Sequence, residues 1–328
     1  MLARIPTREY SKRLGPLSAE QLQAALDRFD LGELRSASPV SEGLFGQNVF
    51  VNSTRGKWVL RGAPLADWQL PRERFFAERL DELGALGAPW PYWLEDSPDL
   101  FGWSFAMMRR LHGRSLAVAD ASLEEVGSAL GEGLARLHAL TSEAPGGYDP
   151  VTDAFQPEPP PYSERIVDRA HDWLRRCREA SSETTDDDAV WIESVLDENR
   201  AAIDEPFAAT YVHHDYKPNN VLGQRGPAGL RATGIVDLME GYFGDPEEDL
   251  VRSVADLARS DVAATHRFVE AYRAARPLRP GHRERYRVYQ LIDCLIIWEY
   301  ARRNRVWFPE GLPFRRYAEQ FILELDPF

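Results

Sequence analysis

The feature that most constrains the fold is a polar segment enclosed between two short strand-like runs. The segment reads His213-His-Asp-Tyr-Lys-Pro-Asn-Asn220; it follows the run 210–212, and the run 233–236 leads into Asp237, seventeen residues beyond Asn220. A single Asp or Asn in such a turn usually forms or caps that turn. Asp215, Asn220 and Asp237 together, in this order around two strands, instead indicate a functional loop that the strands hold in place.

The first third of the chain has the pattern of a small antiparallel sheet. Two β-type runs, 48–51 and 57–60, are separated by turn residues at 52–56, as in a hairpin. The apolar spacing predicts a helix over 71–86, and a further strand is expected over 103–108. Ahead of these elements, Ser18 and Gln21 form a capping-box pattern that predicts a short amphipathic helix.

Helical patterns dominate after Gly113. Ser122 and Glu125 form a second capping box, which precedes a run with leucines along one face. The stretch 146–161, rich in Pro and Gly, is expected to be a loop over the helices. The sequence therefore predicts an α+β protein with two lobes. The small N-terminal antiparallel sheet lobe covers 1–110, and a larger, mainly helical C-terminal lobe covers 111–328.

The acidity of the chain is unevenly distributed and argues against nucleic acid as a partner. The formal net charge is −13 at pH 7, whereas phosphate backbones are bound by an excess of Lys and Arg. Between Glu143 and Glu205 there are 17 Asp and Glu residues against 6 Arg and no Lys. This segment either attracts cations or forms a solvated helical face with an acidic loop at 186–188.

No segment is expected to enter a membrane. The N-terminus lacks the apolar region of a signal peptide, and the apolar stretch Leu291–Trp298 is short and interrupted by Asp293. A cytoplasmic location is the default expectation. Cys177 and Cys294 lie far apart in the sequence without CxxC spacing, so both are interpreted as packing residues. Nothing in the sequence indicates an oligomeric state.

Three stretches agree in order and spacing with a known family. The stretch from His214 to Asn220 resembles the catalytic loop of protein kinases, and with 235–240 and 244–249 it is more similar to the aminoglycoside phosphotransferase and choline kinase family. The resemblance covers about residues 36–260 and implies a bilobal protein-kinase-like fold. The short interval from Asp237 to Asp249 leaves little room for the peptide-docking loop of an ordinary protein kinase.

The resemblance implies a magnesium- and nucleotide-dependent phosphotransferase with a small set of catalytic residues. Phosphoryl transfer mainly requires alignment of an alcohol and neutralisation of charge on the phosphates. Asp215 would accept a hydrogen bond from the substrate hydroxyl and take its proton. Asn220 and Asp237 would supply oxygen ligands to Mg²⁺, and Lys217 is placed to meet the transferred phosphoryl group.

A nucleotide site is expected in the first lobe on the same grounds. Gly43 and Gly46, in the stretch 41–48, would let backbone N–H groups approach the phosphates of ATP or GTP. Met108 lies in the stretch 107–111, where the family's interlobe hinge offers backbone groups to the nucleotide base.

The cation that contacts the α- and β-phosphates departs from the kinase pattern. Arg61 occupies the strand position where a Lys is expected, and Lys57 on the same strand edge is an alternative. Arg and Lys differ in hydrogen-bond geometry. Glu73 matches the helix carboxylate that pairs with this cation, with Glu78 as the substitute.

Supporting roles are expected for five further residues. The ring of His214 is predicted to hold the metal-binding turn by hydrogen bonds, with His213 packed or partly exposed. Asp249 resembles the family's structural Asp after the metal loop. A helix start suffices to explain Asp245 and Glu248 on either side of that turn.

The acceptor region is the least defined. Trp298, Glu299, Tyr300 and Trp307, with Asp293, could line a pocket for a cationic acceptor through cation–π and carboxylate contacts. Aromatic residues at this spacing are also typical of a core.

Three functions remain open at this level. The first is transfer of the γ-phosphate of ATP or GTP to a hydroxyl of a cationic small molecule, an aminoglycoside-like antibiotic being favoured. The second is a metabolic kinase for choline, an amino alcohol or a sugar. The third, from another class, is a nucleotide-binding pseudokinase or regulatory module.

Overall fold

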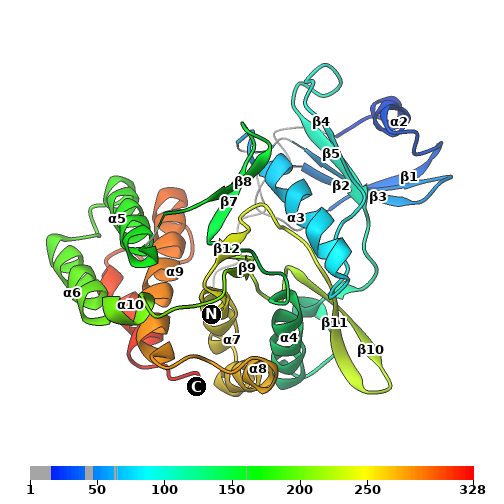
Figure 1. The fold of residues 1–328 in the computed structure, drawn as a ribbon. Helices are drawn as coiled ribbons and strands as arrows, with labels where there is room; N and C mark the ends of the chain where they lie inside the picture. Colours follow the sequence, from blue (N-terminus) through cyan, green and yellow to red (C-terminus); the bar gives the residue numbers. More distant parts are fainter. Residues whose placement is uncertain (1–15, 41–46, 63, 65, 160) are drawn as a thin grey trace.

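The chain folds into two lobes in the computed structural model (Figure 1), which describes residues 16–40, 47–62, 64, 66–159 and 161–328. The smaller lobe holds a five-stranded antiparallel sheet with helices α2 (Ala19–Arg28) and α3 (Gln69–Leu83). The larger lobe is mainly helical. The predicted α+β bilobal architecture is therefore confirmed.

The small-lobe sheet is built around the predicted hairpin. In β2 every second side chain is buried, and Asn52 pairs with Lys57 where the chain turns back. Helix α2 packs its apolar face on this sheet, and its capping box between Ser18 and Gln21 is formed as predicted. The strand order is β1 (Leu34–Pro39), β2 (Gln47–Ser53), β3 (Lys57–Gly62), β5 (Phe105–Arg109) and β4 (Tyr92–Glu95).

Helix α3 ends three residues before the predicted boundary at 86. Gly84 follows it with φ +66°, in the left-handed region that residues with a Cβ avoid, and thereby stops the helix. Phe76 and Leu80 on α3 are fully buried and belong to the core shared with the larger lobe. This packing fixes the position of Glu73, one turn before Phe76 on the same helix.

Two small sheets hold the polar segment 213–220. The predicted strand 210–212 is β9, and residues 234 and 235 of the second predicted run end β11, with Val236 directly after it. Residues 213–220 therefore connect β9 of one sheet to β10 of the other, and β10 pairs with β11. The sheets are β11 (Gly229–Ile235), β10 (Val221–Gly226) and β6 (Arg114–Ser115), and β8 (Ala154–Pro157), β7 (Gly146–Asp149), β12 (Tyr242–Gly244) and β9 (Thr210–Val212).

The prediction of a loop over 146–161 is wrong, because this stretch contains the β7–β8 hairpin. Gly146 pairs with Phe243 of β12 on one side and with Pro157 on the other. A Cβ on Gly146 would lie 2.2 Å from the carbonyl oxygen of Gln156. The glycine that suggested a loop is thus needed for close approach of two strands.

In the large lobe, α4 packs against α8, whereas α5, α6 and α10 pack against α9. The capping box of α4 between Ser122 and Glu125 is formed as predicted. Among the described residues, no helix is both long enough and apolar enough to cross a membrane. The helices are η1 (Leu116–Val118), α4 (Leu123–Leu137), α5 (Tyr162–Ala180), α6 (Asp186–Ile203), η2 (Pro246–Asp249), α7 (Leu250–Ala258), α8 (Val262–Ala275), α9 (His282–Asn304) and α10 (Phe314–Ile322).

Helices α4 and α8 approach closely because α4 presents glycine at the contact. A Cβ added to Gly131 would lie 2.2 Å from the carbonyl oxygen of Phe268, a backbone atom that cannot turn aside. We expect Gly131→Ala to lower the free energy of unfolding by about 1–3 kcal/mol in urea denaturation. Gly147→Ala is the matched control, since a Cβ there meets nothing within 4 Å. Equal urea midpoints for the two variants would contradict this account of the contact.

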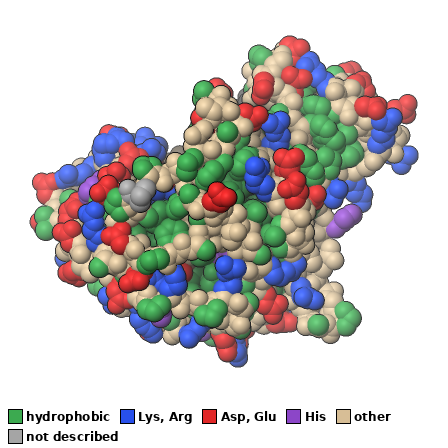
Figure 2. All heavy atoms as spheres, viewed as in Figure 1, with side chains coloured by type: hydrophobic (Ala, Val, Ile, Leu, Met, Phe, Trp, Pro, Cys, Tyr) green, Lys and Arg blue, Asp and Glu red, His purple; other side chains and the backbone are tan. Residues whose placement is uncertain are grey.

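The acidic segment forms the outer helices α5 and α6. Residues 186–188, predicted as an acidic loop, are instead the first turn of α6, where Thr185 caps the backbone N–H of Asp188. Acidic residues are favoured at a helix N-terminus by the helix dipole. Many of these acids are paired with Arg, as in Arg175–Glu179 and Arg178–Asp186. Figure 2 shows both charge signs intermixed over this part of the surface, which favours the solvated-face interpretation.

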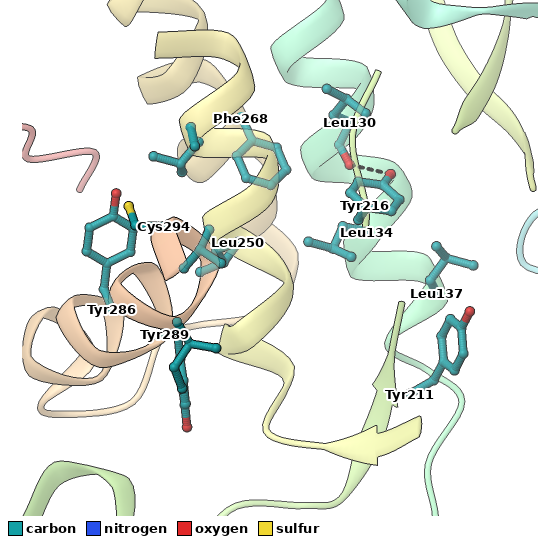
Figure 3. Close-up of a cluster of buried hydrophobic side chains, with 14 of the residues drawn as sticks. Leu130, Leu134, Leu137, Tyr211, Tyr216, Leu250, Phe268, Tyr286, Tyr289 and Cys294 are labelled. Carbon is teal, nitrogen blue, oxygen red and sulfur yellow. Dashed lines mark hydrogen bonds between the residues drawn. The ribbon is translucent and has the colours of Figure 1, made fainter. Parts of the chain in front are cut away.

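The buried core anchors the polar segment through Tyr216 (Figure 3). The Tyr216 hydroxyl donates to the carbonyl oxygen of Leu130 on α4 at 2.9 Å, among the buried side chains of Leu134 and Phe268. Ser253 of α7 donates to the Tyr216 carbonyl oxygen at 2.8 Å. The residue that follows Asp215 is therefore fixed at both its side chain and its backbone.

Candidate active site

One large cleft, with a volume of about 1200 Å³, is lined by residues of both lobes. Val59 and Met108 come from the small-lobe sheet, whereas Asp215 and Asp237 come from the loops after β9 and β11. The predicted catalytic, metal-binding and nucleotide-binding residues that the structure describes line this cleft together: Arg61, Glu73, Met108, Asp215, Lys217, Asn220 and Asp237.

His213 and Asp249 shape the loop that carries Asp215. The two carboxylate oxygens of Asp249 accept the backbone N–H groups of His213 and His214, each at 2.7 Å. The His213 ring lies 3.0 Å from the Val236 carbonyl oxygen through Nε2 and accepts the Asp215 N–H through Nδ1 at 3.3 Å. The ring that holds the turn is therefore that of His213, and the assignment of this role to His214 was wrong.

His214 takes a different position beside Tyr242. Its backbone has φ +67°, and its ring lies against Tyr242 with a centroid distance of 5.7 Å. Burial, with the nearby charge of Arg169, lowers the pKa of His214 to about 4. The ring is therefore neutral at physiological pH.

Asp215 is surrounded by donors and cations. Lys217 Nζ lies 2.9 and 2.7 Å from its two carboxylate oxygens, and Asn220 Nδ2 donates to its carbonyl oxygen and to Oδ2 at 2.9 and 2.8 Å. Arg252 Nε lies 3.2 Å from Oδ1. Burial alone would raise the pKa of the Asp215 carboxyl, but Arg252 and Lys217 outweigh it and the pKa is lowered. Asp215 is therefore an anion at neutral pH.

Asp237 lies beside Asn220 in a strained conformation. Its φ is +67°, unusual for a residue with a Cβ. The N–H of the preceding Val236 donates to the carbonyl oxygen of Asn220 at 3.0 Å, which joins the two loops. Among the described residues, no donor reaches Asn220 Oδ1 or Asp237 Oδ2. Both side chains line the cleft with an oxygen left for a ligand.

Arg61 bridges the two lobes. Its Nη1 lies 3.1 Å from Glu73 Oε1, and its Nη2 donates to Asp237 Oδ1 at 2.6 Å. Glu73 also accepts the Tyr92 hydroxyl at 2.8 Å and the Leu238 N–H at 3.1 Å. Burial raises the pKa of the Glu73 carboxyl, and the charge of Arg61 opposes that shift.

The alternatives Lys57 and Glu78 do not line this cleft, whereas Arg61 and Glu73 do. Met108 lines the cleft, buried on β5 between β3 and β4. Gly43 and Gly46 lie outside the described residues.

The predicted acceptor pocket is only partly formed by the residues named for it. Trp298 is fully buried, stacks on Tyr317 at 5.8 Å and donates to Thr184, so it belongs to the core. Glu299 pairs with Arg303. Of the five candidates, Trp307 and Asp293 line the cleft, and Trp298, Glu299 and Tyr300 do not.

Three cleft residues on or next to α7 were missed: Arg252, Asp256 and Arg259. Arg252 pairs with Asp215 and also with Asp293 of α9, at 3.0 Å through Nη2. A signal was present in the sequence, because α7 begins directly after Asp249, and residues 252, 256 and 259 recur at the spacing of one helix face.

Asp245 and Glu248 do more than start a helix. Asp245 caps the N–H of Glu247 as expected. It also pairs with Arg279 and accepts the Tyr289 hydroxyl, and Glu248 pairs with Arg169. These buried contacts tie the start of η2, and with it Asp249, to α5, to α9 and to the segment before α9.

Solved structures share this fold. A thermostable mutant of aminoglycoside phosphotransferase APH(4)-Ia in complex with ADP and hygromycin B has a TM-score of 0.63 at 19% identity, covering 87% of this chain and 92% of that one. The GDP complex of aminoglycoside 2'-phosphotransferase-IIIa has a TM-score of 0.60 at 16% identity, covering 93% and 97%. The chain thus shares the kinase-like fold of these structures.

The chain belongs to the phosphotransferase enzyme family, APH, whose model matches residues 36–289. Its curated relatives include the homoserine kinase of Pseudomonas aeruginosa, which is 27% identical over 330 residues and covers 95% of this chain and 92% of the relative. The homoserine kinase of Neisseria meningitidis serogroup B is 24% identical over 293 residues, covering 86% and 88%. The chain is accordingly an enzyme that phosphorylates a hydroxyl group.

Proposed function

We propose that this enzyme transfers the γ-phosphate of ATP to the hydroxyl of a small amino-acid-like acceptor, with homoserine as the leading candidate. The observation that carries the transfer chemistry is the meeting of Asp215, Asn220 and Asp237 with the Arg61–Glu73 pair in one interlobe cleft. Homoserine comes first because relatives of that name align along nearly the whole chain.

In this proposal Asp215 orients the acceptor hydroxyl and receives its proton. Its lowered pKa keeps the carboxylate ionised and able to accept a hydrogen bond. Lys217 Nζ contacts the same carboxylate and would also contact the phosphoryl group during its transfer, where its positive charge would stabilise the negative charge. His213 and Asp249 hold the loop, so Asp215 is preorganised by the backbone.

The donor set suits a magnesium nucleotide. Mg²⁺ favours one or two protein carboxylate or amide oxygens together with phosphate oxygens, and the free oxygens of Asn220 and Asp237 match that requirement. The ion would neutralise charge on the phosphates. Arg61 would contact the α- and β-phosphates, Met108 would lie at the base, and Gly43 and Gly46 would approach the phosphates by backbone N–H groups.

An aminoglycoside acceptor is the second candidate. The shared fold with aminoglycoside phosphotransferases favours it, but the acidic segment 143–205 contributes no residue to the lining of the cleft. Choline, other amino alcohols and sugars are further metabolic alternatives with the same core. A regulatory module without transfer activity fits poorly with a chain that belongs to an enzyme family.

The test is phosphate transfer from MgATP and MgGTP to homoserine, choline, sugars and aminoglycosides, followed as acceptor-dependent nucleoside diphosphate release. We expect transfer to homoserine to exceed transfer to every other acceptor. Transfer to an aminoglycoside alone would replace the acceptor in this proposal, and absence of transfer to every acceptor would contradict the function itself.

A further inference from the structure

The end of the cleft next to Asp215 has a balanced set of charges. It is formed by the Asp215 loop with α7, α9 and α10. A further acid there, Glu324, pairs with Arg316 at 3.0 Å. The other charged side chains are three carboxylates and three cations: Asp215, Asp256, Asp293, Lys217, Arg252 and Arg259.

Most of these charges are satisfied within the protein. Lys217 and Arg252 pair with Asp215, and Arg252 also pairs with Asp293. Asp256 and Arg259 are different. Within the described part of the chain, neither side chain has a hydrogen-bond or ion-pair partner, and both line the cleft. One anion and one cation are therefore available to a ligand.

The two available groups lie close together. They are three positions apart, Asp256 on α7 and Arg259 at its C-terminal cap, and side chains at this spacing have Cβ atoms about 5–6 Å apart. Asp256 is half-buried and Arg259 exposed. Burial raises the pKa of Asp256, and the charges of Arg259, Lys217 and Arg252 oppose this, which indicates that these groups share one electrostatic environment.

We infer that Asp256 and Arg259 form an acceptor subsite that binds the ammonium group and the carboxylate of an α-amino acid. This inference rests on the proposed function and specifies its acceptor. A zwitterion presents one positive and one negative group on neighbouring atoms, which matches one free carboxylate beside one free guanidinium. A polycation would find a single uncompensated acid and would meet Arg259 as a repulsive charge.

The subsite also agrees with the position of Asp215. Arg252 contacts Asp215 and lies one turn before Asp256 on α7. In this proposal the hydroxyl of the acceptor lies at Asp215 while its amino-acid group lies at 256 and 259. Homoserine carries these groups, and two analogues each lack one charged group: 4-hydroxybutanoate lacks the amine, and 3-amino-1-propanol lacks the carboxylate.

The test is equilibrium binding, which does not depend on turnover. Homoserine and the two analogues are titrated calorimetrically into the full-length enzyme with magnesium and a non-hydrolysable ATP analogue. The parent is compared with Asp256→Asn and Arg259→Met. Matched controls are Asp197→Asn and Arg273→Met, which change exposed residues of α6 and α8 outside the cleft. Thermal unfolding verifies that each variant is folded.

Each variant should lose the affinity that one functional group of the ligand contributes: the amine for Asp256→Asn and the carboxylate for Arg259→Met. Charged hydrogen bonds of this kind correspond to about 10- to 100-fold in affinity. Asp256→Asn should weaken homoserine binding by about that factor and leave 4-hydroxybutanoate unchanged. Arg259→Met should weaken homoserine similarly and leave 3-amino-1-propanol unchanged. The control variants should bind all three ligands as the parent does.

Several outcomes would overturn the inference. They are no homoserine binding to the parent, parent-like binding by both variants, or equal weakening of all three ligands. Phosphate transfer to an aminoglycoside without homoserine binding would overturn it while leaving the transferase activity intact. Binding with the predicted pattern but no phosphate transfer would support the subsite and contradict the proposed function, so the two failures are distinguishable.

Discussion

Asp215→Asn is expected to lower kcat by about 10²- to 10⁴-fold, the contribution typical of a positioned general base. The amide is nearly the same size as the carboxylate and can still accept a hydrogen bond, but it cannot take the proton of the acceptor. Nucleotide affinity should stay close to that of the parent, because Asp237 and Asn220 retain their free oxygens. Steady-state kinetics and nucleotide titration of the purified variant measure the two quantities.

The control for this variant is Asp197→Asn, a change of the same chemistry on an exposed face of α6. It should have parent-like kcat. Removal of the Asp215 charge leaves Arg252 with Asp293 as its ion-pair partner, so the variant should remain folded. A parent-like kcat in Asp215→Asn would exclude Asp215 as the base, and equal loss of kcat and nucleotide affinity would assign it to binding instead.

Local patterns predicted the elements that depend on neighbouring residues. The two capping boxes and the hairpin at 52–56 involve contacts within a few positions of the chain, and all three are formed. The pairing of Arg61 with Glu73 followed from the family resemblance and is also present, at 3.1 Å. The second partner of Arg61, Asp237, lies 176 positions away, and nothing in the local pattern indicated it.

Long-range packing decided the cases in which the predictions were wrong. Trp298 was a pocket candidate by spacing, but Tyr317 and Phe314 of α10 cover it. His213 and His214 are adjacent and have the same side chain, and the ring of His213 is the one that contacts the Val236 carbonyl oxygen. Residue type and spacing cannot determine such contacts, because they depend on how distant elements pack.

The residues at the acceptor end of the cleft could not be predicted from the sequence either. The resemblance identified the two loops that carry Asp215 and Asp237, and phosphoryl transfer to any acceptor requires their chemistry. Asp256 and Arg259 lie in an ordinary amphipathic helix pattern, and a solvated helix face would carry the same residues. These two residues are functional candidates because they line the cleft and, within the described part of the chain, have no hydrogen-bond or ion-pair partner. Only the three-dimensional structure shows this.

The second large effect is expected for Arg61→Met, which should weaken both folding and nucleotide binding. Glu73 would remain buried with the Tyr92 hydroxyl and the Leu238 N–H but without a counter-charge. Loss of one partner of a buried ion pair costs about 3–5 kcal/mol, so the urea midpoint should fall clearly. The Kd for MgATP should rise as well, since the cation proposed to contact the phosphates is absent.

The double variant Arg61→Met/Glu73→Gln separates these two effects. The Tyr92 hydroxyl and the Leu238 N–H reach different oxygens of Glu73. The introduced amide keeps a carbonyl oxygen for Leu238, and its NH2 can donate to the Tyr92 hydroxyl oxygen. Because the unpaired charge is also removed, a large part of the lost stability should return. Nucleotide affinity should not return, because no cation has been restored. Recovery of both quantities would mean that Arg61 acts on the nucleotide site only through the fold. Recovery of stability alone would support direct contact of Arg61 with the phosphates, and hence Arg as the functional replacement for the Lys of other kinases.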